Sequence, residues 1–141
     1  MININAPIIP YQGMGGLHLG WSKEQVENVV EKPLCQRMEI SQKISRYTIP
    51  NKLLLFFNEK EDRLIKITTL PGYQGKLFGK IGTDTTEDEF QFLEPTLQYD
   101  EFSEVFVSEE KGVFIETKLP EAKASWISVF VEDLDKLYED E

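Results

Sequence analysis

The residues of this chain that could do chemistry are few, and their spacing forms no catalytic set. His18 is the sole histidine and Cys35 is the sole cysteine. A histidine needs an oriented partner to act as a general base, and it needs further ligands at set spacings to hold zinc. No H-x-x-H or comparable spacing surrounds His18. We therefore expect no catalytic residue, no metal site and no cofactor, and we do not expect an enzyme.

Two other features of reactive or ligand-binding type have simpler structural explanations. Residues 13–16 read Gly-Met-Gly-Gly, but no G-K-[S/T] follows as a phosphate-binding loop requires, so we predict a flexible turn. Cys35 has no second cysteine to pair with and no activating base close by in sequence. We expect Cys35 to behave as a small, buried apolar residue.

The acidic residues are more informative, because they are concentrated in one part of the chain. Residues 1–83 carry 11 Lys+Arg against 7 Asp+Glu, whereas residues 84–141 carry 4 against 18, within a formal net charge of −10. Such a density repels nucleic acid and anionic membranes and attracts basic proteins. The carboxylates lack the ligand spacing of a calcium loop. We expect a basic protein partner, with neither nucleic acid nor a membrane involved.

Aromatic residues lie among these carboxylates. Tyr99 and Phe102 flank Asp100 and Glu101 in a segment that we expect to be a loop beyond Pro95. An aromatic side chain ringed by charge is typical of the residues that anchor a protein interface. Taken singly, each carboxylate also fits an ordinary solvated position. The predicted partner-binding residues are Glu87, Asp88, Tyr99, Asp100, Glu101, Phe102, Glu104, Glu109 and Glu110.

Two short helices should position the segments around them. Ser22 with Gln25, and Thr86 with Glu89, have the types and spacing of capping boxes at helix N-termini. The first helix should end before Pro33 and the second before Pro95, because a proline forces the preceding residue out of helical geometry.

Several strands follow each predicted helix. Apolar runs and alternation predict strands at residues 43–49, 53–57, 63–70, 104–108, 112–119 and 125–131. We predict a single α+β domain over residues 1–141, with one antiparallel sheet and both helices packed together on one face. The helix-then-strands order recurs in residues 13–70 and 75–132, and both a tandem duplication and chance similarity fit this weak repeat.

The chain carries no sign of export or membrane insertion. Its first residues lack the basic and apolar regions of a signal peptide, and no apolar run approaches the roughly 18 residues of a membrane span. We expect a cytoplasmic protein. The oligomeric state does not follow from the sequence.

Residues 19–26 read LGWSKEQV, and Lys32-Pro33 follow the predicted helix. This segment resembles the opening of small α+β modules found in BamE-like outer-membrane assembly lipoproteins and, duplicated, in β-lactamase inhibitor proteins. The resemblance implies an α+β repeat fold. The chain departs from those families because it lacks a lipoprotein signal and a disulfide pair.

In its general character the whole chain also resembles the immunity proteins of bacterial toxin systems, such as those of contact-dependent growth inhibition. These proteins tend to be small, acidic and cytoplasmic, and to lack catalytic motifs. The resemblance implies that the chain binds and neutralises a basic nuclease toxin. The alternative is a non-enzymatic assembly module, whose oppositely charged halves could pair head to tail between copies.

Overall fold

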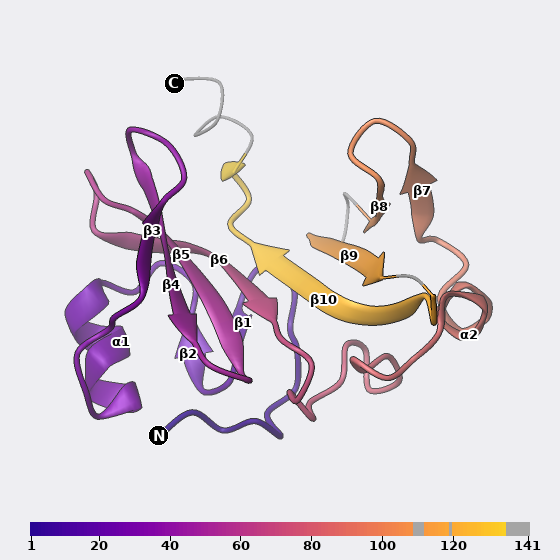
Figure 1. Cartoon of the computed structure of the whole chain (residues 1–141), viewed down its shortest axis with the longest axis horizontal. Helices are drawn as coiled ribbons and strands as arrows, with labels where there is room; N and C mark the ends of the chain where they lie inside the picture. Colours follow the sequence, from indigo (N-terminus) through magenta and orange to yellow (C-terminus); the bar gives the residue numbers. More distant parts are fainter. Residues whose placement is uncertain (109–111, 119, 135–141) are drawn as a thin grey trace.

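The computed structural model describes residues 1–108, 112–118 and 120–134 and shows two short helices beside antiparallel sheets (Figure 1). The helices are α1 (Lys23–Val30) and α2 (Glu87–Leu93). One sheet has eight strands, and a second has two. The predicted α+β class is therefore confirmed.

The two-stranded sheet is a hairpin formed by β1 (Gly13–Met14) and β2 (Leu17–His18). Gly15 and Gly16 connect the strands with φ angles of 69° and 87°, which glycine adopts without steric cost. The hydroxyl of Tyr73 accepts a hydrogen bond from the Gly15 N–H at 2.8 Å and donates one to the Ala6 carbonyl at 2.6 Å. The glycine-rich segment is thus an ordered hairpin, and the Tyr73 hydroxyl links it to a distant part of the chain.

The eight-stranded sheet has a mirrored strand order, β3-β4-β5-β6-β10-β9-β8-β7. Its strands are β3 (Arg37–Glu39), β4 (Ile44–Ile49), β5 (Leu53–Asn58), β6 (Arg63–Thr69), β7 (Gln98–Asp100), β8 (Val105–Ser108), β9 (Val113–Lys118) and β10 (Lys123–Phe130). Each group of four consecutive strands follows its own helix. A tandem duplication would produce this order, and the duplication itself stays a prediction.

Both helices begin with the capping boxes that the sequence predicts. The Ser22 side chain accepts from the Gln25 backbone N–H at 3.2 Å, while the Gln25 side chain accepts from the Ser22 N–H at 2.9 Å. Thr86 and Glu89 make the same reciprocal pair in α2. The helices end before Pro33 and Pro95, as predicted.

The larger hydrophobic core lies between the sheet and the helices. Val26 of α1 and Phe90 of α2 are fully buried in the same cluster as Leu55, Ile67 and Ile115 of the sheet. The expectation that the helices pack together is wrong, because Figure 1 shows α1 and α2 at opposite ends of the sheet. Each helix covers the end formed by the strands of its own half, and the two halves meet through β6 and β10.

The opposite face of the sheet, which we call the open face, carries a smaller apolar cluster. Ile44, Phe56, Ile65 and Phe130 are buried there. Residues 131–134, which follow β10, contribute Val131 and Leu134 to this cluster, and Asp133 forms an ion pair with Arg63 at 3.1 Å. Leu19, Leu54 and Phe114 pack against this cluster and are only partly buried.

Side-chain hydrogen bonds join the two halves of the sheet at the β6–β10 seam. The Oγ atoms of Thr68 and Ser128 lie 2.6 Å apart. The hydroxyl of Thr69 accepts from the Ile127 N–H at 2.9 Å and donates to the Ser125 carbonyl at 3.1 Å. The Thr69 side chain therefore satisfies two backbone groups of β10 that precede Ser128, the first β10 residue paired with β6.

The sequence analysis missed the two edge strands. Residues 98–102 were expected to form a loop, but Gln98–Asp100 pairs with β8 as β7, and Arg37–Glu39 pairs with β4 as β3. Each strand has three residues and one neighbour, and exposed polar residues at such an edge give no apolar alternation to detect.

We predict that Thr69→Val destabilises the fold by about 1–3 kcal/mol, because it leaves the Ile127 N–H without its partner inside the sheet. Thr48→Val, at a half-buried β4 position whose hydroxyl makes no hydrogen bond within the described residues, is the matched control and should change stability by less than about 0.5 kcal/mol. Chemical denaturation measures both. Equal effects of the two substitutions would show that the Thr69 hydroxyl does not hold the seam.

Candidate partner-binding surface

The side chains that could take part in catalysis or metal binding lie apart from one another. His18 is exposed at the end of β2, and its ring centroid is 4.9 Å from that of Trp21. Cys35 is exposed, so the expectation of a buried cysteine is wrong. It sits in the loop between α1 and β3, and such connections run over the surface. Among the described residues, no group of three His, Cys, Asp or Glu side chains could hold a metal ion.

Most of the predicted partner-binding residues gather at one end of the sheet, around α2, β7 and the turn after β7 (Figure 1). We call this end the acidic edge and define it by Glu87, Asp88, Tyr99, Asp100, Glu101, Phe102 and Glu104. Two other predicted residues, Glu109 and Glu110, lie outside the described residues.

Asp100 holds the turn at the end of β7 in a defined shape. Its carboxylate accepts from the Ser103 hydroxyl at 2.7 Å and from the Phe102 N–H at 3.1 Å. The Glu104 N–H closes the turn on the Asp100 carbonyl at 2.8 Å, and Glu104 adopts a φ of 60°. The bond from Ser103, followed by that from Phe102, lowers the pKa of Asp100 below its ordinary value. Asp100 therefore orders the turn.

The ordered turn carries an unusually exposed aromatic side chain. Phe102 is 98% exposed, whereas Tyr99 is 52% exposed and rests on Phe106 with a centroid separation of 5.1 Å. Glu101 and Glu104 beside Phe102 are also exposed. This large apolar ring, surrounded by carboxylates, is fully hydrated in the free chain. It can therefore bury its whole surface against a partner.

Helix α2 adds acidic residues at the opposite end of β7. Asp88 is exposed and Glu87 is half-buried, and both lie in the first turn, where negative charge also stabilises the helix. The sequence analysis did not select Phe92, which is 85% exposed. Phe92 lies two residues after the buried Phe90, and this spacing places it on the other side of α2. The same spacing in the sequence could have identified Phe92 as exposed.

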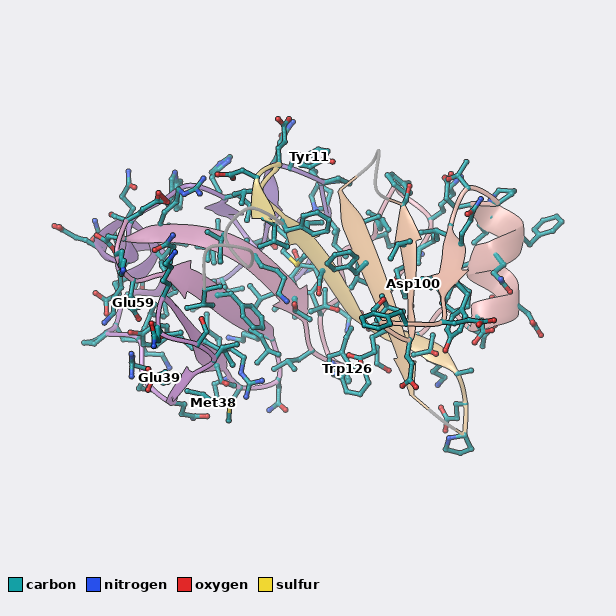
Figure 2. All side chains as sticks on the ribbon, turned by 90° about the horizontal axis from the view of Figure 1, so that it is seen from above. Tyr11, Met38, Glu39, Glu59, Asp100 and Trp126 are labelled. Atoms are coloured by element: carbon teal, nitrogen blue, oxygen red, sulfur yellow. The ribbon has the colours of Figure 1, made fainter. Side chains whose placement is uncertain are left out.

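The other edge of the sheet differs in chemistry. Met38 of β3 is 49% exposed, Ile40 just beyond β3 is 42% exposed, and Arg37 lies 3.6 Å from Glu59. In Figure 2, Met38 and Glu39 lie at the far end of the sheet from Asp100. The two edges are therefore separate surfaces.

Comparisons with models of protein families, with curated proteins and with solved structures gave no match to this chain. Within residues 1–108, 112–118 and 120–134, neither helix has the length and apolar character needed to cross a membrane.

We predict that Ser103→Ala raises the pKa of Asp100 toward its ordinary value, because the substitution removes the largest cause of the depression. Carbon-detected NMR titration measures this pKa. The pKa of Glu89, which hydrogen bonds from Thr86 hold low in α2, should stay unchanged and serves as an internal reference. An unchanged Asp100 pKa would mean that its hydrogen bond with Ser103 does not persist in solution.

Proposed function

We propose that this chain is an immunity protein, which binds a basic nuclease toxin through the acidic edge and neutralises it in the cytoplasm. The observation that carries the proposal is Phe102, a fully exposed aromatic ring on an ordered turn among carboxylates. The concentration of 18 acidic residues in residues 84–141 supports a partner of opposite charge.

In this proposal the two kinds of side chain have different tasks. Glu101 and Glu104 attract the basic substrate-binding cleft of the toxin, and this attraction raises the association rate at low salt. Phe102 then enters an apolar pocket of the toxin and slows dissociation. Because Asp100 already orders the turn, binding loses less conformational freedom than it would for a disordered segment.

The charge at β7 also determines how a partner can approach. An edge strand presents unpaired backbone groups that invite indiscriminate strand pairing, and flanking charges oppose such pairing. Asp100, Glu101 and Glu104 surround the end of this short strand. The acidic edge therefore favours a partner that supplies basic side chains over one that adds a neutral strand.

We predict that the immobilised protein captures a basic protein from a lysate of its own source, and that rising salt releases it. The captured protein, once purified, should degrade nucleic acid, and equimolar addition of this chain should stop the degradation. A combined Glu101→Lys, Phe102→Ala and Glu104→Lys variant should lose this capture and this inhibition.

The matched control places the same type of charge reversal far from the acidic edge. Glu24→Lys with Glu39→Lys changes two exposed residues in the other half of the chain and should leave capture and inhibition intact. Equal loss of capture and inhibition in both variants would mean that net charge alone causes the effect. Full nuclease inhibition by the acidic-edge variant would overturn the proposed site.

A second candidate function is a self-associating assembly module. Exposed Met38 and Ile40 at the β3 edge, within the part of the chain with a formal excess of basic residues, complement the acidic edge of another copy. Such head-to-tail contacts build an open filament unless the rotation between successive copies closes a ring.

Light scattering over a salt series tests this second candidate. If the module forms, the mass in solution should exceed the 16.3 kDa of one chain at low salt and fall toward it as salt rises. Met38→Ser with Ile40→Ser should lower the mass at low salt. A mass of one chain at all salt concentrations would exclude charge-driven assembly.

A further inference from the structure

Strand β3 is an outer edge of the eight-stranded sheet, and its three residues are all exposed. Just beyond it, the Ile40 N–H donates to the Ile44 carbonyl of β4 at 2.9 Å. Backbone groups of successive strand residues point alternately to either side, so those of Met38 face β4, and those of Arg37 and Glu39 face away from the sheet. Within the described residues, these outward groups have no hydrogen-bond partner. The β3 edge can therefore accept another strand.

The side chains of β3 divide between the two faces of the sheet. Arg37 lies opposite Tyr47, which is buried in the larger core, so Arg37 and Glu39 lie on the face that the helices cover. Met38, between them, lies on the open face and is 49% exposed. Ile40, which is also exposed, follows Met38 by two residues, the spacing that puts both on one face. Figure 2 labels Met38 and Glu39 at this edge.

The order Arg-Met-Glu is self-complementary when two copies of β3 pair in antiparallel fashion. If Met38 lies opposite the partner's Met38, each Arg37 lies opposite the partner's Glu39. Opposite charges directly across an antiparallel pair stabilise it. The outward backbone groups of Arg37 and Glu39 also meet those of the partner, as a hydrogen-bonded pair requires. Side-chain charge and backbone geometry therefore favour the same arrangement.

The same charges disfavour the neighbouring registers. The backbone also allows pairing centred on Arg37 or on Glu39, because both residues have outward groups. Those registers place Arg37 opposite the partner's Arg37, or Glu39 opposite the partner's Glu39, and like charges directly opposite are destabilising. Edge charges ordinarily oppose strand pairing of any kind. The charges of β3 instead select the register centred on Met38.

Arg37 keeps donors for a second carboxylate beside the contact within its own chain. Its Nε lies 3.6 Å from a carboxylate oxygen of Glu59, and half of its side chain is exposed. A guanidinium group carries five N–H donors, so the terminal nitrogens can bind the partner's Glu39. On the open face, Met38 and Ile40 of both copies would bury apolar surface around the two-fold axis.

We propose that the chain forms a closed dimer in which β3 pairs with β3 of a second copy and Met38 lies on the two-fold axis. Such an interface is isologous, so each Arg37–Glu39 contact occurs twice. The dimer joins two eight-stranded sheets into one and leaves β7, with its acidic edge, at each outer end. It does not depend on toxin binding. It competes with the head-to-tail contact, because both use the β3 edge.

Sedimentation velocity over a concentration series tests the dimer with the full chain. The mass should rise from 16.3 kDa toward twice that value and stop there. Arg37→Glu and Glu39→Arg should each weaken dimerisation at least about tenfold, because each dimer would then contain two like-charge pairs. Lys76→Glu, an exposed charge reversal between β6 and α2, is the matched control and should leave dimerisation unchanged. Circular dichroism checks that each variant folds.

Mixing the two single variants separates strand pairing from general charge effects. In a heterodimer of the Arg37→Glu and Glu39→Arg chains, unlike charges are opposite at both positions. An equal mixture should therefore recover dimers that neither variant forms alone at the same concentration. A mixture that stays monomeric, or an unmodified chain that is monomeric at every concentration, would overturn the proposal.

A disulfide probe reads the register directly. In a Cys35→Ser background, Met38→Cys places two thiols at a non-hydrogen-bonded pair, where the Cα atoms are about 4.5 Å apart and a disulfide can form. Ile40→Cys leaves the thiols four residues out of register, about 13 Å along the strand, which is too far for a bond. Mild oxidation should cross-link only the Met38→Cys chain. Equal cross-linking, or a mass that keeps growing as in a head-to-tail filament, would contradict the closed dimer.

Discussion

The pairing of β6 with β10 is the constraint on which the rest of the architecture depends. Each half of the chain forms a helix and four strands, and a sheet of four strands alone would leave two unpaired edges. Joining the last strand of each half covers one edge of each and makes a single sheet of eight strands. The hydroxyls of Thr68, Thr69 and Ser128 bind across this junction, so the seam is held by side chains as well as by the backbone ladder.

This junction also determines which surfaces are presented. Because β6 and β10 are central, β3 and β7 become the two outer edges, and α1 and α2 move to opposite ends of the molecule. The uneven charge of the sequence thereby becomes a separation in space. Strand β7, which leads into Glu101 and Glu104, and strand β3, which carries Arg37 and Met38, are the two outermost strands of the sheet. Only the β7 end has the charge that favours a basic partner.

The charged side chains differ in how far their hydrogen bonds are satisfied within the chain. Asp100 accepts bonds from its own turn and thereby orders Phe102 for contact. On the open face, burial lowers the pKa of Lys66 to about 8 although Glu116 opposes the shift, and the buried Nε of Arg46 has no hydrogen-bond acceptor among the described residues. A charge with satisfied hydrogen bonds stabilises local structure, whereas a buried donor without an acceptor costs free energy.

The sequence by itself determined the local features of the fold. Ser22 and Thr86 place their caps, and Pro33 and Pro95 end their helices, because these effects act within a few residues. The apolar runs also located β4, β5 and β6. Only the tertiary structure decided the edges and faces. Residues 98–100 form a strand because β8 supplies partners distant in sequence, and Cys35 is exposed because its loop crosses the surface. Strand register, which depends on the whole sheet, also places Arg46 and Lys66 on the same face.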